Sequence, residues 1–418
     1  MADNAYVWVW LPKANEPVVA GIIRRDDHTG GDRPSYTFQY GRSYLARDGA
    51  IPLFSELPLG SDIQEPSYGL DIAGVLLDST PDSWGRRVVD EKVFGHRTRD
   101  SEPAHLDLLT YMLESGSDRI GALDFQASPT DYVPRGADGH PSIEQLLAAA
   151  DLIEEGRPLP ASLADALFLG TSVGGARPKA LVHDGHRRLI AKFPSTTDTI
   201  PVVQHEAVAM DLARQVGLDV AHTEIVPVAG RNVLLVERFD RGTAGTRRMQ
   251  VSAATILGIN PDNSRAAASY PALADKIRTS FVASDATLRE LFGRIVFNII
   301  VRNTDDHARN HAAFWDGTAL TLTPAYDIAP ARGRRDSVAS HPMALTADGD
   351  NRSQLSVAVN AASAFHLTSV DAQDIIDYQV DIVGREFNDS ADRARLTNRQ
   401  RDNLIGSTIL NPAIFWDA

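Results

Sequence analysis

The sequence predicts a two-lobed α+β fold, preceded by a mixed α/β subdomain and ending in a mostly helical C-terminal lobe. Three observations predict this. Two alternating runs are typical of strands: aromatic residues alternate with valine at 6–10 and with polar residues at 36–40. A strand at 188–193 carries a lysine near its end and leads into a helix. After a long apolar helix comes an Asp–Asn–Asp pattern, in the order that kinases use.

Composition sets the broad class. A chain of 418 residues is too long for one ordinary core, and 43% hydrophobic residues indicate a folded globular protein. There is no cysteine, which excludes disulfides, cysteine-ligated zinc and thiol catalysis. No segment reaches about eighteen uncharged apolar residues, and no basic stretch precedes an apolar run at the N-terminus. We expect a cytoplasmic protein that does not enter a membrane.

The net charge of −14 should repel polyphosphates, so direct DNA binding is not expected. One local basic patch comprises Arg332, Arg334 and Arg335. It is interpreted equally well as a solvated surface loop or as a group that holds a substrate or phosphate.

Residues 1–125 are predicted to form the N-terminal subdomain. Its strands are followed by a helical stretch near residues 70–93, with Pro81 at a helix start. Residues 126–160 are rich in Pro, Gly and Asp, which predicts a linker region.

Residues 161–240 are predicted to bind ATP. Small residues at 170–179 form a Gly-rich loop whose backbone N–H groups can approach phosphate oxygens, although such a loop is more often an ordinary turn. A hairpin follows, with strands at 180–183 and 188–193. Strand alternation places Lys192 on the face opposite Leu189, Ala191 and Phe193. An isolated lysine there usually extends to water.

The next helix, 203–216, ends at Gly217 and carries Glu206 on its inward side. A strand lysine paired with a helix glutamate orients ATP phosphates in protein kinases, so Lys192 and Glu206 are a candidate pair, with Glu224 and Glu237 as other candidates. The strand at 232–241 then predicts a hinge. Backbone groups of Glu237, Arg238 and Phe239 would meet adenine there, unless the segment is only an edge strand that runs into a loop.

Residues 241–418 are predicted to form the catalytic, mostly helical lobe. Ser284 is predicted to cap a buried helix with apolar residues at intervals of three and four, and residues 371–382 form another helix. In the loop after the first helix, Asp305 is a candidate base, and Asn310 and Asp327 supply oxygens suited to magnesium. Taken singly, such residues more often cap helices and turns.

A zinc hydrolase is a less favoured alternative. His307 and His311 lie four residues apart, a spacing that binds metal when it falls on a helix. No third ligand of comparable clarity follows in the sequence.

These motifs together resemble the HipA family, the serine/threonine kinase toxins of bacterial type II toxin–antitoxin systems. The resemblance covers nearly the full chain and is carried by residues 76–83, 119–123, 172–179, 236–241 and 303–310. It implies a HipA-like fold in which Asp305 is the catalytic base and Asn310 and Asp327 bind Mg2+. The implied ATP-binding residues are Val173, Gly174, Gly175, Ala176, Arg177, Pro178, Lys179, Lys192, Glu237, Arg238, Phe239, His307, Asn310, Tyr326 and Asp327.

The resemblance also implies regulation and partners. Autophosphorylation of Ser172 would inactivate the enzyme, because a phosphate adds up to about two negative charges to a loop built to hold ATP. The substrate would be a translation protein such as glutamyl-tRNA synthetase. A HipB-like antitoxin would neutralise the toxin and provide most of the contact with DNA. The expected phenotype is growth arrest and persistence.

The sequence departs from the family pattern at two places, and these departures bear on the identity of the substrate and on the switching of the Gly-rich loop. Arg177 and Pro178 stand where the family often has Gln-Glu, and residues 249–252 replace a more acidic segment. Two other classes stay open: a small-molecule kinase of the aminoglycoside or choline type, and a catalytically silent co-repressor.

Overall fold

The computed structural model describes residues 2–27, 34–67, 69–95, 106–136, 141–160, 163, 167, 175–260, 268–334 and 337–416. The chain forms two compact units. The first unit comprises Met1–Thr197, Pro227–Val251 and Phe314–Thr318. The second unit comprises Asp198–Val226, Ser252–Ala313 and Ala319–Ala418. Each is described below by itself.

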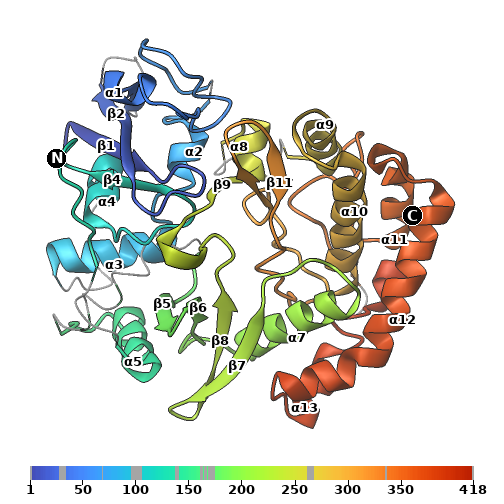
Figure 1. Ribbon diagram of the computed structural model, residues 1–418. Coiled ribbons are helices and arrows are strands. Elements are labelled where there is room, and N and C mark those ends of the chain that lie inside the picture. The colour runs from blue at the N-terminus through green and yellow to red at the C-terminus, as the bar shows by residue number, and fades with distance from the viewer. Residues whose placement is uncertain are drawn as a thin grey trace. The chain divides into compact units, whose positions relative to one another are not determined.

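The first unit begins with an antiparallel sheet in the order β3-β2-β1-β4 (Figure 1). Its strands are β1 (Asn4–Val9), β2 (Val18–Asp26), β3 (Ser35–Tyr40) and β4 (Leu123–Gln126). The predicted strands at 6–10 and 36–40 are therefore confirmed. Alternate residues of β1, Ala5, Val7 and Val9, form a fully buried face, which explains why the sequence pattern predicted a strand here.

Five helices accompany this sheet in the described part of the first unit. They are α1 (Arg42–Leu45), α2 (Gly74–Leu77), α3 (Ser83–Phe94), α4 (Leu108–Glu114) and α5 (Ile143–Glu154). The helical stretch predicted near 70–93 is two helices, and Asp82 rather than Pro81 directly precedes α3. The helix α5 lies within the predicted linker region. Its sequence signal was a capping box, in which Ser142 and Gln145 satisfy each other's backbone N–H groups.

A second sheet has the order β5-β6-β8-β7. Its strands are β5 (Lys179–Asp184), β6 (Arg187–Lys192), β7 (Thr223–Val228) and β8 (Arg231–Glu237). The predicted hairpin is confirmed, with Gly185 at a φ of 57° in the turn between β5 and β6. Leu189 and Ala191 are buried while Lys192 is half-buried, as the alternation predicted. Three short strands, β9 (Met249–Ser252), β10 (Ala312–Trp315) and β11 (Leu320–Leu322), form a sheet in the order β11-β10-β9.

The second unit is mostly helical, as predicted. Its α-helices are α7 (Val202–Gln215), α8 (Ala253–Leu257), α9 (Tyr270–Ser280), α10 (Ser284–Ile300), α11 (Leu355–Ala361), α12 (Ser369–Arg393) and α13 (Asn398–Leu404). Short 3-10 helices are η1 (Thr243–Gly245, in the first unit), η3 (Ala362–Phe365) and η4 (Pro412–Phe415). The predicted helix at 371–382 is the central part of the longer α12.

Helix α10 lies at the centre of this unit and contacts α9, α11 and α12 (Figure 1). Its predicted apolar stripe is buried. The predicted cap is wrong in detail: Ser284 is the first helical residue, and the N-cap position belongs to Ala283, which has a φ of 51° and makes no side-chain cap hydrogen bond. The start of the helix is stabilised by burial of Thr287 in its first turn. The Thr287 hydroxyl donates to the Ala283 carbonyl (3.1 Å).

Replacing Phe292 should test the importance of this core. The side chain is fully buried in α10, so Phe292→Ala is expected to lower the free energy of unfolding of the second unit by about 3–5 kcal/mol. Val370→Ala is the control, because Val370 is 70% exposed and its loss should change stability by less than about 0.5 kcal/mol. Denaturant unfolding of both variants measures this, and equal losses would contradict the assignment of α10 to the core.

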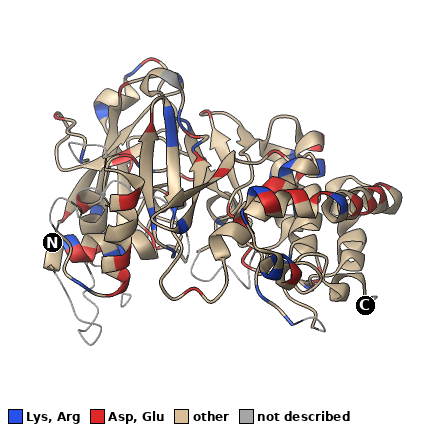
Figure 2. Cartoon of the chain, turned by 90° about the horizontal axis from the view of Figure 1, so that it is seen from below, with Lys and Arg blue, Asp and Glu red and all other residues tan. Residues whose placement is uncertain are grey.

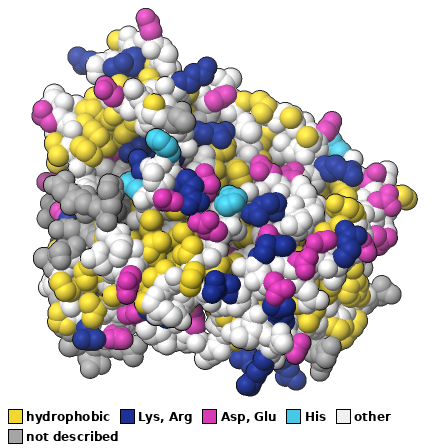
Figure 3. Space-filling model, turned by 60° about the horizontal axis from the view of Figure 1, so that its bottom comes forward, with side chains coloured by type: hydrophobic (Ala, Val, Ile, Leu, Met, Phe, Trp, Pro, Cys, Tyr) yellow, Lys and Arg dark blue, Asp and Glu magenta, His cyan; other side chains and the backbone are white. Residues whose placement is uncertain are grey.

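Helices α7 and α12 lie side by side, with Ser390 and Arg393 of α12 both donating to the Asp211 carboxylate of α7 (2.6 and 2.7 Å). Helix α12 carries seven acidic and two basic residues. Figure 2 colours the ribbon red at acidic residues and blue at basic ones. On the face in Figure 3, basic and acidic side chains of the described residues are intermixed, without a broad basic surface.

Among the described residues, none of the helices combines the length and apolar character needed to cross a membrane.

A buried histidine in α7 predicts a pH dependence of stability. His205 is 7% exposed, and burial lowers its pKa to about 4. The folded state thus favours neutral imidazole, so the stabilisation is complete above the unfolded pKa of about 6.5 and is lost as the pH falls toward 4. Between pH 7 and 4.5 we expect the free energy of unfolding to fall by about 2–3 kcal/mol more in the parent than in His205→Leu. Denaturant unfolding at both pH values measures the difference, and parallel losses would contradict it.

Candidate active site

The predicted catalytic loop, residues 303–310, lies in the second unit directly after α10. Asp305 is exposed to solvent. Its backbone carbonyl accepts two hydrogen bonds, from the His307 N–H (2.9 Å) and from the Asn310 side-chain Nδ2 (2.9 Å). The loop therefore closes on itself and brings the Asn310 amide to Asp305. Because the amide nitrogen is engaged, the Asn310 Oδ1 is the atom left to coordinate a cation.

The neighbouring carboxylate, Asp306, points the opposite way into the protein. It is 2% exposed and is bonded by Asn298 Nδ2 (2.7 Å), His311 Nε2 (2.9 Å) and the Tyr270 hydroxyl. Burial alone would raise the pKa of Asp306, but His311 and the hydrogen bonds outweigh it and lower the pKa. The sequence analysis did not predict this anchor. Its only sequence signal was the adjacent pair Asp305 and Asp306, which directly follows a helix predicted to be buried.

Asn303 extends the anchor back to the helix. Its N–H donates to the Asn298 carbonyl (2.8 Å), and its Nδ2 donates to the Asn298 Oδ1 (3.1 Å). The loop is thus bonded to the last turn of α10 at one end and to the buried Asp306 in its middle. Asp305, between these two attachments, is exposed.

Asp327 follows β11 and has a φ of 59°, a conformation that L residues rarely adopt and that often occurs at functional sites. The preceding residues are fixed within the second unit. The Tyr326 hydroxyl donates to the Arg309 carbonyl (2.8 Å), and the Ala325 N–H donates to the Asp219 carbonyl (2.8 Å). The side chain of Tyr326 therefore bonds the catalytic loop just before Asp327.

The zinc alternative gains no support from the described residues, where no three His, Asp or Glu side chains gather in a way that would hold a metal ion. The His311 ring is accounted for by its contacts with Asp306 and Tyr270. His307 is half-buried on the catalytic loop. The oxygen atoms of Asp305, Asn310 and Asp327 are hard donors of the kind that suit Mg2+.

In the first unit, the structure describes the Gly-rich loop from Gly175 onward. Ser172, Val173 and Gly174 lie outside the described residues. Gly175 has a φ of 111°, and a Cβ there would lie 2.6 Å from the Lys179 Nζ, so the loop passes directly over that ammonium. The backbone conformation favours glycine at this position, and a side chain there would displace the end of Lys179.

Two lysines project from one face of the β5–β6 hairpin, because Lys179 and Lys192 are direct partners in its antiparallel register. Lys179 is 2% exposed, and its carbonyl accepts from Trp84 Nε1 (2.9 Å). The Phe193 N–H donates to the Pro178 carbonyl (3.0 Å), which extends the pairing to the loop. Ala176 and Arg177 complete the described part of the loop.

The predicted hinge follows β8. The Arg238 N–H already donates to the Arg188 carbonyl of β6 (2.9 Å), so strand alternation directs the backbone groups of Glu237 and Phe239 to the other side. Those two residues are the ones whose backbone could meet adenine. Phe239 is half-buried, and its ring lies edge-on to Phe314 (5.8 Å between centroids).

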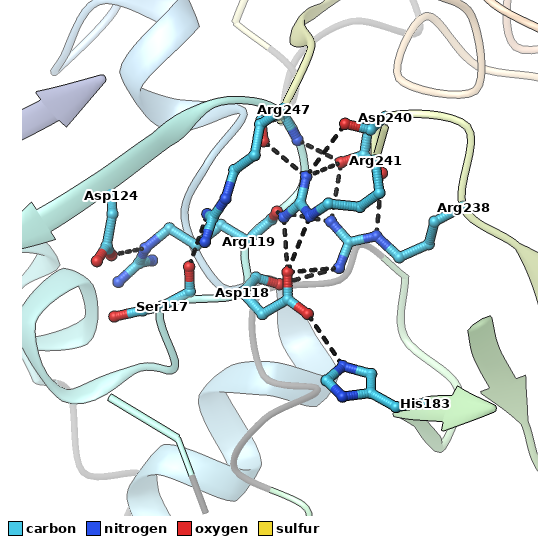
Figure 4. Close-up of polar contacts among 10 residues, drawn as sticks. Ser117, Asp118, Arg119, Asp124, His183, Arg238, Asp240, Arg241 and Arg247 are labelled. Atoms are coloured by element: carbon cyan, nitrogen blue, oxygen red, sulfur yellow. Dashed lines mark hydrogen bonds and ion pairs between the residues drawn. The ribbon is translucent and has the colours of Figure 1, made fainter. Parts of the chain in front are cut away.

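A buried ion cluster holds the hinge from the N-terminal part of the same unit (Figure 4). The Arg238 guanidinium is 1% exposed and pairs with Asp118 (3.0 Å) and Asp240 (2.8 Å). Arg241 bridges the same two carboxylates (2.7 and 2.8 Å). The Gly121 N–H donates to Asp240 Oδ2 (2.7 Å). Burial opposes ionisation of Asp118 and Asp240, but the two arginines outweigh it and lower both pKa values.

Comparison with known proteins decides the family. The model of the HipA-like C-terminal domain matches residues 171–387, which is more than half of the chain. The chain belongs to this family. The matched range includes residues 172–179, 236–241 and 303–310, which carried the predicted resemblance, and membership of the HipA family is confirmed.

Relatives in the HipA-like family are named as kinases. "Putative kinase Y4mE" of Sinorhizobium fredii is 28% identical over 336 residues, covering 74% of each chain. The "serine/threonine-protein kinase toxin HipA" of Shewanella oneidensis is 27% identical over 187 residues, covering 38% of this chain and 42% of that relative. A solved structure of a Shewanella oneidensis complex of HipA, HipB and operator DNA matches with a TM-score of 0.68 and 18% identity, covering 93% of this chain and 92% of that one. The HipA-like α+β fold is therefore confirmed.

Proposed function

We propose that this HipA-like protein is an ATP- and magnesium-dependent serine/threonine protein kinase. The observation that carries the proposal is the catalytic loop, which directs Asp305 to solvent and bonds Asn310 to its backbone while Asp306 is buried below. A loop anchored in this way holds one carboxylate for proton transfer and leaves one amide oxygen for a cation.

In the proposed reaction, Asp305 accepts the proton of a substrate serine or threonine hydroxyl. The hydroxyl oxygen forms a bond to the γ-phosphorus of ATP as the bond to the β-phosphate oxygen breaks, and ADP leaves. Asn310 and Asp327 would hold the magnesium ion, which neutralises charge on the phosphate oxygens when bound. Lys179 and Lys192 on one face of the hairpin would bind phosphate oxygens, and Glu237 and Phe239 would bind adenine.

The biological role is proposed from the relatives. One relative is named a toxin, and one matching structure contains HipB and operator DNA. We propose that this chain is likewise the toxin of a type II system, with a HipB-like antitoxin through which it contacts DNA. Its substrate would be a translation protein in the cytoplasm, such as glutamyl-tRNA synthetase, and phosphorylation of its own Ser172 would inactivate it.

The test is to incubate the purified full chain with Mg2+ and ATP, then to measure intact mass and map phosphopeptides. Parallel reactions contain glutamyl-tRNA synthetase or a panel of hydroxylated metabolites. Phosphate on protein serine or threonine supports the proposal, and phosphate on Ser172 supports self-inactivation. Phosphate only on a metabolite would favour the small-molecule kinase, and no transfer from a protein shown to start unphosphorylated would favour the silent co-repressor.

A further inference from the structure

Arg302 lies between the end of α10 and the catalytic loop, and it is held in an unusual conformation. Its φ is 56°, in the left-handed region that L residues seldom occupy. Such strain persists only where the surrounding structure determines it. Here the Arg302 N–H donates to the Ile299 carbonyl (3.1 Å), and its own carbonyl accepts from the Ala331 N–H (3.0 Å).

The Arg302 guanidinium is buried without an acidic partner among the described residues. The residue is 6% exposed. Its hydrogen bonds go to the Ser337 carbonyl (3.2 Å) and, at 3.5 Å, to the Ser337 hydroxyl. A buried arginine has five N–H donors and is costly without a counter-ion. Accordingly, burial lowers the pKa of Arg302.

The segment that faces this guanidinium is itself basic. Arg332 and Arg334 are exposed on either side of Gly333. A Cβ at Gly333 would lie 2.0 Å from the Arg302 Nε, so the guanidinium fills the space that a side chain would occupy. The Ser337 hydroxyl is half-buried and donates to the Arg334 carbonyl (3.2 Å). A serine hydroxyl thus lies against a buried cation, in a segment that carries two further arginines.

We propose that Ser337 is a phosphorylation site whose phosphate is bound by Arg302. This inference deepens the proposed kinase function, which would supply the phosphoryl group. The Ser337 Oγ of one chain attacks the γ-phosphorus of ATP bound to a second copy. The new O–P bond forms as the β–γ bridge breaks, the hydroxyl proton passes to Asp305 of that second copy, and ADP leaves.

A phosphate at Ser337 would supply what this site lacks. It carries up to about two negative charges and three acceptor oxygens, and it would form charge-assisted hydrogen bonds with the donors of Arg302. Because Arg302 directly precedes Asn303 and bonds Ala331, the phosphate would hold the segment after Asp327 to the base of the catalytic loop. A new Arg–phosphate pair beside the catalytic loop is a known way to switch a kinase on.

The first experiment does not depend on the kinase activity of this chain. The full chain is produced with phosphoserine genetically encoded at position 337, and its phosphate is titrated by 31P NMR. In the parent the phosphate should titrate about one pH unit lower than in the urea-unfolded chain, because a cation lies within ion-pair distance. In Arg302→Gln this difference should disappear, and in Arg302→Lys it should be partly kept. Equal titration in the parent and in Arg302→Gln would overturn the proposal.

Gly333→Ala is a second variant that keeps every charge. The added methyl group must displace the guanidinium, so the phosphate should titrate as it does in Arg302→Gln. Thermal unfolding of each variant identifies one that has failed to fold. An unshifted titration in folded Gly333→Ala would show that the phosphate does not meet Arg302.

The second experiment tests the source and the effect of the phosphate. After incubation with Mg2+ and ATP, phosphopeptide mapping should find Ser337 modified in the parent and in an Asp305→Ala chain mixed with active parent. Phosphate on other residues but never on Ser337 would reject self-modification and leave the proposed kinase function standing. No transfer to any residue would reject the kinase function, while the NMR result would stand by itself. The phosphorylated chain should be about tenfold more active than Ser337→Ala, and equal rates would reject a regulatory role.

Discussion

Replacing Asp305 by alanine should lower kcat by about 10²–10⁴-fold and leave the affinity for ATP within about twofold. The reason is chemical: Asp305 is the exposed carboxylate of the catalytic loop, and general bases contribute rate factors of that size. ATP would be held by the lysines of the hairpin and the backbone of the hinge, which the substitution leaves unchanged. Steady-state kinetics with a protein substrate and equilibrium binding of ATP measure the two quantities.

The same substitution should leave the stability of the fold nearly unchanged. The loop is closed by the backbone carbonyl of residue 305, which accepts from His307 and Asn310, and alanine keeps that carbonyl. The midpoint of thermal unfolding should therefore move by less than about 1 °C. A variant that retains more than about a tenth of the parental kcat, or that loses ATP binding together with activity, would contradict the assignment of Asp305 as the base.

The sequence was sufficient for features that depend on local patterns. Alternation in β6 placed Lys192 correctly, and the apolar spacing of α10 predicted a buried helix. The loop residues Asp305 and Asn310 were chosen by spacing, and the structure bonds them to each other. Each of these signals lies within a few residues of the feature that it predicts.

Features that depend on tertiary contacts were not predictable in this way. The backbone of Arg238 was predicted to lie in the hinge, but the sequence did not indicate that its guanidinium is buried against Asp118, which lies 120 residues earlier in the chain. No short-range pattern distinguishes a buried arginine from an exposed one. The same holds for Arg302, whose neighbour Ser337 comes from a separate segment.

The Asp305–Asp306 pair shows this division most clearly. Two identical side chains follow each other, and the structure gives them opposite roles. The sequence favoured Asp305 only because Asn310 lies five residues later. What fixes the outward direction of Asp305 is the burial of Asp306 among Asn298, Tyr270 and His311, and these come from three places in the chain.

Replacing Asp306 should therefore damage the enzyme through its structure. Asp306→Asn keeps the shape of the side chain but replaces an acceptor oxygen by an amide N–H₂ among the existing donors. A buried donor that loses its acceptor costs about 1–3 kcal/mol, so the free energy of unfolding of the second unit should fall by at least that amount. The kcat should fall as well, because the loop that carries Asp305 loses its anchor.

Stability as a function of pH separates this role from a catalytic one. The folded state lowers the pKa of Asp306, so its stabilisation is complete above the unfolded pKa of about 3.9 and is lost as the pH falls further. Asp306→Asn should therefore lose less stability than the parent between pH 5 and pH 3. Denaturant unfolding across this range measures the two curves. If Asp306→Asn were as stable as the parent at pH 7, the buried carboxylate would not be the anchor of the loop, and the outward direction of Asp305 would need another cause.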